Sequence, residues 1–219
     1  MRILDREPFR RFVALLDNFT ASPLLGEHRY PPEKLAEIAR EKTEFQDSVL
    51  ATRVMRETRR YLIEQGQVGP DEAEFRALVD RIWFGFFKAK LDLSGFENVF
   101  VGETEERDNG RIGGYRSWIK FYLDEKAGIQ NYLGHRMTSP AADVVLLSHA
   151  WIVPQTSKVY RKVNGGFWVG TSPQLELAMA TIAYFEGGGL LRLGDREVEL
   201  ALQASEDSQY IRTLDLLPR

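Results

Sequence analysis

The sequence predicts an α+β protein, in which helices come first and small antiparallel sheets packed with two helices follow. Two observations support this prediction. Apolar residues recur at helical spacing up to about residue 87, and beyond residue 128 the pattern changes to short apolar runs of strand length. No internal repeat or low-complexity linker interrupts the chain. We therefore expect a helical subdomain over residues 1–90 and an α+β core over residues 91–219, joined in one contiguous unit.

The composition is that of a globular protein. Of the 219 residues, 43% are hydrophobic and 28% are charged, and the net charge is −3. This charge gives no global attraction to nucleic acid, so any RNA site must be a local basic patch. The absence of cysteine excludes disulfides and thiolate chemistry. The sequence has no apolar signal core and no membrane-spanning stretch, which predicts a cytoplasmic protein that does not enter a membrane.

Helical periodicity defines the first part of the chain. We expect a first helix over residues 8–19, followed by a loop that is rich in proline and glycine. Pro32 fits the first turn of a helical stretch that continues to about residue 62 as two helices with a bend. The clearest helical pattern covers residues 71–87. Its apolar positions stay in register: Phe75, Leu78, Val79, Ile82 and Phe86. We interpret these stripes as core packing.

The segment from Phe96 to Gly128 combines a predicted hairpin with a predicted helix. Bulky residues alternate over residues 97–102, which predicts a strand. Asn109-Gly110 is a strong turn signal, and the short return strand ends at Gly113-Gly114, where the backbone can approach another group closely. A helix then begins at about Arg116, and Gly128 is its expected C-cap.

Strand patterns and one further helix fill the rest of the chain. We expect a buried strand over residues 144–153 and another over residues 159–163. A helix begins near Pro173, with Thr171 or Ser172 as its cap, and it ends at Gly187-Gly188-Gly189. The closing strands are predicted over residues 190–193, 197–201 and 210–216.

Several of these segments resemble the EndoU family of endoribonucleases, whose members include the poly(U)-specific, XendoU-type enzymes. The motifs that carry the resemblance are Gly95-Phe96-Glu97, Val99-Phe100-Val101-Gly102-Glu103, Gly114 with Trp118, Phe121-Tyr122-Leu123 with Glu125-Lys126, and the run from Lys162 to Pro173. Shorter matches continue through the helical part: Leu15-Leu16-Asp17-Asn18, Leu50-Ala51-Thr52 and Ile82-Trp83-Phe84. The resemblance therefore covers nearly the whole chain and implies an EndoU-like core.

The resemblance also implies a chemistry. In this family the 2′-hydroxyl of an RNA strand attacks the adjacent phosphate and leaves a cyclic phosphate, with one histidine as base, another as acid and a lysine beside the phosphate. The family lysine corresponds to Lys162, but the two histidine positions are occupied by Asn98 and Arg116. Neither side chain exchanges a proton near neutral pH. Each lost proton transfer typically lowers the rate by about 10² to 10⁴.

Other site residues are also assigned from the resemblance. Thr213 matches a threonine that contacts the uracil, whereas Asp215 replaces a tyrosine that contacts the base and sugar. Glu97 and Glu103 match family acids and are expected to hold neighbouring groups in place. Two adjacent glycines would let the backbone approach a ligand: Gly165 and Gly166.

Three histidines remain as candidates for acid–base chemistry. His135 lies in an expected loop, Gly134-His135-Arg136, and is the candidate replacement acid or base. His149 lies in the predicted buried strand and is interpreted as a hydrogen-bonded core residue. His28 is expected to be exposed in the N-terminal loop.

Three functional hypotheses follow. The favoured one is a catalytically impaired member that binds single-stranded RNA or another phosphate ligand through Lys162 and Arg116. The second is an active uridylate-directed endoribonuclease that leaves 2′,3′-cyclic phosphate ends and uses a rearranged acid/base set with His135. The third is a protein-interaction module. We expect a monomer with no metal ligand and no cofactor, although the resemblance implies that manganese could stimulate activity.

Overall fold

The computed structural model describes residues 3–19, 32–88, 93–105, 110–139, 144–153, 157–193 and 196–217. The helices in these ranges are α1 (Glu7–Leu16), α2 (Pro32–Leu50), α3 (Arg53–Glu64), α4 (Glu72–Phe84), α5 (Trp118–Lys126) and α6 (Pro173–Glu186). The strands are β1 (Phe86–Lys88), β2 (Leu93–Ser94), β3 (Glu103–Glu105), β4 (Arg111–Gly113), β5 (Gln130–Ser139), β6 (Val144–Ile152), β7 (Val159–Trp168), β8 (Gly189–Leu193), β9 (Arg196–Ala204) and β10 (Ile211–Leu217). The α+β class is confirmed.

Helix caps explain where the N-terminal helices begin. The Thr52 hydroxyl accepts a hydrogen bond from the Met55 amide, so the predicted bend falls between α2 and α3. The Asp71 carboxylate caps α4 in the same way. The prediction that this helix continues to residue 87 is wrong, because the backbone at Gly85 is extended and the helix ends at Phe84. Gly85 also packs closely on Tyr210, since a Cβ at this position would lie 2.3 Å from the tyrosine ring. The expected proline- and glycine-rich loop lies outside the described residues.

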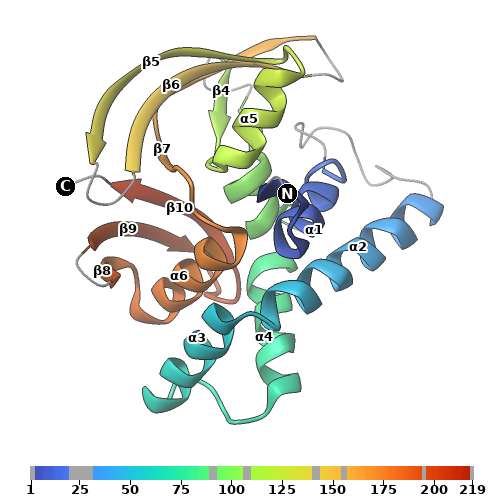
Figure 1. The fold of residues 1–219 in the computed structure, drawn as a ribbon, viewed down its shortest axis with the longest axis vertical. Helices are drawn as coiled ribbons and strands as arrows, with labels where there is room; N and C mark the ends of the chain where they lie inside the picture. The colour runs from blue at the N-terminus through green and yellow to red at the C-terminus, as the bar shows by residue number, and fades with distance from the viewer. Residues whose placement is uncertain are drawn as a thin grey trace.

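The strands form two main sheets and one short hairpin, β1 with β2 (Figure 1). The five-stranded sheet has the order β3-β4-β7-β6-β5 and curves over α5, while the three-stranded sheet has the order β10-β9-β8 and packs on α6. Neighbouring strands are antiparallel except β4 and β7, which run parallel with Arg111 beside Arg161. The predicted return strand is confirmed as β4, but its antiparallel partner is β3, not the strand expected over residues 97–102.

Two sequence predictions for the sheets need correction. Residues 97–101 form a helical turn rather than a strand, because Phe96 and Phe100 both face the core four residues apart, with ring centroids 5.1 Å apart. The expected loop around His135 is part of strand β5, whose partner β6 supplies the hydrogen bonds. Short apolar runs fit either a helix or a strand, and tertiary packing decides between them.

The core has two parts. The main cluster joins the helices to the three-stranded sheet and includes Phe12, Phe45, Phe100, Leu177 and Leu214. It therefore contains residues from both predicted subdomains. A smaller cluster lies between the five-stranded sheet and α5, and it includes Ile112, Tyr115, Leu147, Trp151, Tyr160 and Phe167. In the described part of the chain, no helix has the length and apolar character that crossing a membrane requires.

Candidate functional site

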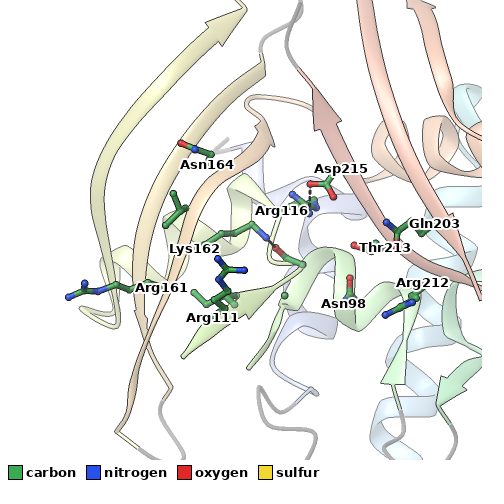
Figure 2. A pocket seen from close by; sticks show the side chains of 14 residues that line it. Asn98, Arg111, Arg116, Arg161, Lys162, Asn164, Gln203, Arg212, Thr213 and Asp215 are labelled. Atoms are coloured by element: carbon green, nitrogen blue, oxygen red, sulfur yellow. Dashed lines mark hydrogen bonds and ion pairs between the residues drawn. The ribbon is translucent and has the colours of Figure 1, made fainter. Parts of the chain in front are cut away.

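A cleft of about 540 Å³ opens between the two main sheets. Strands β4 and β7 line one wall, β9 and β10 line the other, and the helical turn before β3 and the segment before α5 line the space between them (Figure 2). The lining residues are Asn98, Arg111, Ile112, Gly113, Gly114, Arg116, Arg161, Lys162, Val163, Asn164, Gln203, Arg212, Thr213 and Asp215. Five of the predicted site residues thus meet in one cleft: Asn98, Arg116, Lys162, Thr213 and Asp215.

Gly114 brings the two histidine-position residues together. It has a φ of +60°, and a Cβ on it would lie 1.6 Å from the Asn98 carbonyl oxygen, so no other residue fits. That carbonyl accepts a hydrogen bond from the Tyr115 amide (3.1 Å), and the Val99 carbonyl accepts one from the Arg116 amide (2.8 Å). The close backbone approach predicted at Gly114 is confirmed.

Lys162 is held against the same segment. Its side chain is buried, and Nζ donates a hydrogen bond to the Gly114 carbonyl. A Cβ on Gly165 would lie 2.6 Å from Lys162 Cε, so this glycine makes room for the lysine. A Cβ on Gly166 would lie 2.3 Å from the Leu216 carbonyl oxygen, so this glycine lets β7 approach β10. Neither glycine lines the cleft, and the expectation that they admit a ligand is corrected accordingly.

Arg116 forms an ion pair with Asp215 across the cleft, at 2.5 Å between Nη2 and Oδ1 (Figure 2). The arginine side chain is 7% exposed, whereas the carboxylate is 43% exposed. Burial lowers the pKa of Arg116, and the Asp215 charge partly opposes that shift. Nε and Nη1 have no hydrogen-bond partner among the described residues. The guanidinium is therefore buried with part of its donor capacity unused.

Two β-bulges direct consecutive residues into the cleft. On β10, Ile211 pairs with Ala204 and Thr213 with Gln203, which leaves Arg212 as an extra residue. On β7, Lys162 pairs with His149 and Gly165 with Leu147, so β7 has one residue more than β6 between these two pairs. Within this bulge, Asn164 has a φ of +54°. A bulge breaks the alternation of side chains along a strand. Arg212 and Thr213 can therefore both line the cleft, as can the residues that follow Lys162.

The cleft is strongly basic although the whole protein carries a net charge of −3. Of the described residues that line it, five are cations and one is a carboxylate: Arg111, Arg116, Arg161, Lys162 and Arg212 against Asp215. The Arg161 side chain points away from Lys162 (Figure 2). This is the local basic patch that the sequence required for any RNA site.

The remaining predicted site residues lie outside the cleft. Glu97 and Glu103 are buried, and neither lines the cleft. His135 is exposed on β5, at the far edge of the sheet, where the Tyr132 hydroxyl lies 2.6 Å from Nδ1. The structure therefore does not bring His135 to Asn98 or Arg116.

His149 is fully buried, as predicted for a core residue. The expectation that its imidazole is hydrogen-bonded is wrong, because neither ring nitrogen has a partner among the described residues. Aromatic rings surround it, with the Tyr115 ring at 4.8 Å between centroids. Burial, and secondarily the charge of Lys162, lowers the pKa of His149 to about 3. His28 lies outside the described residues.

Sequence reasoning missed five polar residues of the cleft, namely Arg111, Arg161, Asn164, Gln203 and Arg212. Arg111 directly follows the predicted turn at Asn109-Gly110, and this position could have identified it as a candidate site residue. Gln203 and Arg212 come from the second sheet, and only the bulge on β10 places Arg212 beside Thr213. Within the described residues, no three His, Cys, Asp or Glu side chains gather as a metal site requires.

The fold and the cleft define an α+β protein with a cation-rich cleft between its two main sheets. The chain matches the family Endoribonuclease XendoU over residues 2–214, and it belongs to this family. The resemblance inferred from the motifs is thereby confirmed.

Individual relatives cover the chain to different extents. The chain is 31% identical to uridylate-specific endoribonuclease B of Danio rerio over 83% of its length, and 29% identical to poly(U)-specific endoribonuclease-B of Xenopus laevis over 97%. It spans 64% of the Danio rerio protein, 73% of the Xenopus laevis protein and 49% of a Bos taurus uridylate-specific endoribonuclease. Its fold is similar to the solved structure of XendoU, a splicing-independent snoRNA-processing endoribonuclease, with a TM-score of 0.72 and 27% identity over 98% of this chain and 79% of that one.

Proposed function

We propose that this protein binds single-stranded RNA, or another phosphate ligand, in the basic cleft and that its RNA cleavage is weak or lost. The observation that carries the proposal is the nature of the side chains that meet there. The cleft gathers cations and hydrogen-bond donors, and no histidine is among its described lining residues. Such a site can hold a phosphate, but it lacks the groups that would move the protons of the reaction.

Asn98 and Arg116 act as donors in this proposal. The Asn98 side chain is an amide that does not titrate, and arginine stays protonated at neutral pH even where burial lowers its pKa. Lys162 supplies a second positive charge, fixed by its hydrogen bond to the Gly114 carbonyl. Together the arginine and the lysine offer charge-assisted hydrogen bonds to phosphate oxygens. They stabilise a bound phosphate without deprotonating a 2′-hydroxyl.

Asp215 further distinguishes this cleft from a site that is selective for uridine. Its carboxylate occupies the position that the resemblance assigns to a tyrosine, and it pairs with Arg116 at 2.5 Å. The pair holds the guanidinium in place, and it also puts a negative charge where a base and sugar would lie. We therefore expect weak selectivity for uridine compared with the named uridylate-specific relatives.

The test compares cleavage and binding by the same purified protein. A uridine-rich RNA oligonucleotide is incubated from pH 5 to pH 9 with and without manganese, and a 2′-deoxy version, which lacks the attacking hydroxyl, is used for fluorescence anisotropy. We expect no cleavage, and salt-dependent binding that is lost in Lys162→Ala and Arg116→Gln. Arg136→Gln, an exposed arginine on β5, is the control for net charge.

Two results would overturn the proposal. A bell-shaped rate profile that disappears in His135→Ala would establish the active enzyme with a rearranged acid/base set. If the protein has a native circular dichroism spectrum but neither cleaves nor binds the oligonucleotide, the protein-interaction module is the hypothesis that remains.

A further inference from the structure

Two arginines flank the centre of the cleft, and the proposed phosphate contacts at Lys162 and Arg116 do not use them. We propose that Arg111 and Arg212 bind the phosphates on either side of the central one. The ligand would then be a single-stranded nucleic-acid backbone with at least three consecutive phosphates, rather than inorganic phosphate or a mononucleotide. This inference rests on the proposed function, because it extends the same site.

The two side chains come from opposite walls. Arg111 is the first residue of β4, which pairs with β7 and so lies next to the strand of Lys162. Arg212 is the extra residue of the bulge on β10, in the other sheet. Both line the cleft, and Figure 2 shows them on either side of Asn98. Both are exposed, so a ligand crossing the cleft can reach them.

The bulge at Arg212 supports this role. In a regular strand, Arg212 and Thr213 would point to opposite faces of the sheet. The extra residue breaks that alternation, and both line the cleft. Bulges of this kind occur frequently beside functional sites, where they re-aim a side chain. The local backbone therefore places a cation in the cleft that regular pairing would have directed away from it.

The charge environment of these arginines differs from that of the helical part. Seven arginines on α1 to α4 form ion pairs with nearby carboxylates: Arg10, Arg11, Arg40, Arg53, Arg59, Arg60 and Arg76. In the described residues, neither Arg111 nor Arg212 has such a partner, and both share a cleft with Lys162 and Arg116. Cations gathered in this way repel one another, and a ligand with several negative charges relieves that repulsion.

A linear polyanion fits this arrangement better than a compact one. Arg116 and Lys162 can both contact one phosphate, whereas Arg111 and Arg212 lie on separate walls. A nucleic-acid strand carries one charge per nucleotide along its length, so successive phosphates can reach the three positions. Each contact releases condensed counterions, and the salt dependence of binding therefore counts the phosphates that are engaged.

The experiment measures affinity and salt slope together. A labelled ten-nucleotide oligodeoxyuridylate, which cannot be cleaved, is titrated from 25 to about 200 mM salt against wild type, Arg111→Gln, Arg212→Gln and the double variant, with Arg136→Gln as the matched control. Each single variant should lower affinity about five- to tenfold at low salt and reduce the slope of log K against log salt by about 0.7. The double variant should lose about 1.4 in slope. Binding of uridine 3′-monophosphate should change less than twofold, as should decamer binding by Arg136→Gln.

The outcomes separate the two proposals. If the decamer binds wild type and Lys162→Ala abolishes binding, but Arg111→Gln and Arg212→Gln keep the wild-type affinity and slope, the flanking contacts are wrong and the proposed function stands. If wild type binds the monophosphate but not the decamer, the flanking contacts are wrong and the proposed function stands; if it binds neither, both are wrong. An equal loss of monophosphate and decamer binding in the arginine variants would also overturn the inference, because it would indicate a general effect of charge.

Discussion

Arg116 and Lys120 are two buried cations that lie four residues apart in this chain, and their surroundings differ. Lys120 on α5 donates a hydrogen bond to Asp124 (2.6 Å), and the same carboxylate oxygen accepts one from the Tyr115 hydroxyl (2.6 Å). Its ammonium also lies over the rings of Tyr115 and Trp151, at 5.2 and 4.9 Å from their centroids. Arg116 pairs with a carboxylate that is 43% exposed, and two of its nitrogens have no partner among the described residues.

This difference separates a structural pair from a site. Burial lowers the pKa of both cations, and an aspartate opposes the shift in each case. Lys120 is enclosed by a carboxylate and two aromatic rings and does not line the cleft, whereas Arg116 lines the open cleft with two nitrogens that have no partner among the described residues. The number of buried charges is therefore a poor guide to function. The informative observation is whether a buried cation is enclosed by its partners within the fold or faces a cleft with unpaired donors.

Breaking the closed pair should have the largest effect. Asp124→Ala leaves the Lys120 ammonium buried without a carboxylate, which typically costs about 3–5 kcal/mol of unfolding free energy. Chemical denaturation followed by circular dichroism measures this loss. The double variant Lys120→Met/Asp124→Leu removes both charges and should recover most of it. A loss below about 1 kcal/mol in Asp124→Ala would show that the network is not a structural pair.

His149 connects the two regions, because its ring contacts Tyr115 and Lys162 is its register partner on β7. Its folded pKa of about 3 lies below the ordinary value of 6.5, so the fold holds the neutral imidazole. Its contribution to stability is therefore fully present above pH 6.5 and is lost as the pH falls toward 3. We expect protonation of His149 in the unfolded state to lower the unfolding free energy by about 2 kcal/mol between pH 7 and pH 5.

The variant that tests this is His149→Phe, measured by denaturation at several pH values. Its unfolding free energy should fall less between pH 7 and pH 5 than that of wild type. His135→Ala, which removes an exposed imidazole on β5, should keep the wild-type pH dependence. If His149→Phe and wild type lose stability in parallel, the buried imidazole does not control the acid response.

The sequence predicted the helices and strands better than it predicted which residues contact one another in the fold. The helices over residues 8–19 and 71–87 were correct to within a few residues because their apolar stripes are long. The turn at residues 97–101 was mistaken for a strand, since so short a run of apolar residues fits either periodicity. Strand β5 was missed because Gly134 interrupts its pattern, and its pairing with β6 is a tertiary property.

The same limit applies to the site. Motif positions led correctly to the residues that meet in the cleft, among them Asn98, Arg116 and Lys162. The ion pair between Arg116 and Asp215 was not predicted, because 99 positions separate its partners along the chain. Two substitutions that look independent in the sequence are in contact in the fold. Local patterns carry no information of this kind, and neither do they reveal the bulge that places Arg212 beside Thr213.

Removing the charge of Asp215 should have the smallest effect on unfolding free energy, but it should clearly raise the affinity for the decamer. Asp215→Asn keeps the shape of the side chain but frees Arg116 from a carboxylate that competes with phosphate. Decamer affinity should rise about tenfold, equivalent to about 1.4 kcal/mol, while unfolding free energy should change by less than about 1 kcal/mol because the pair is partly exposed. Asp207→Asn, an exposed acid between β9 and β10, removes the same charge outside the cleft and should leave affinity unchanged. If Asp215→Asn binds more weakly than wild type, the carboxylate positions the guanidinium for the ligand, and the Arg116 pair is then a closed network like that of Lys120.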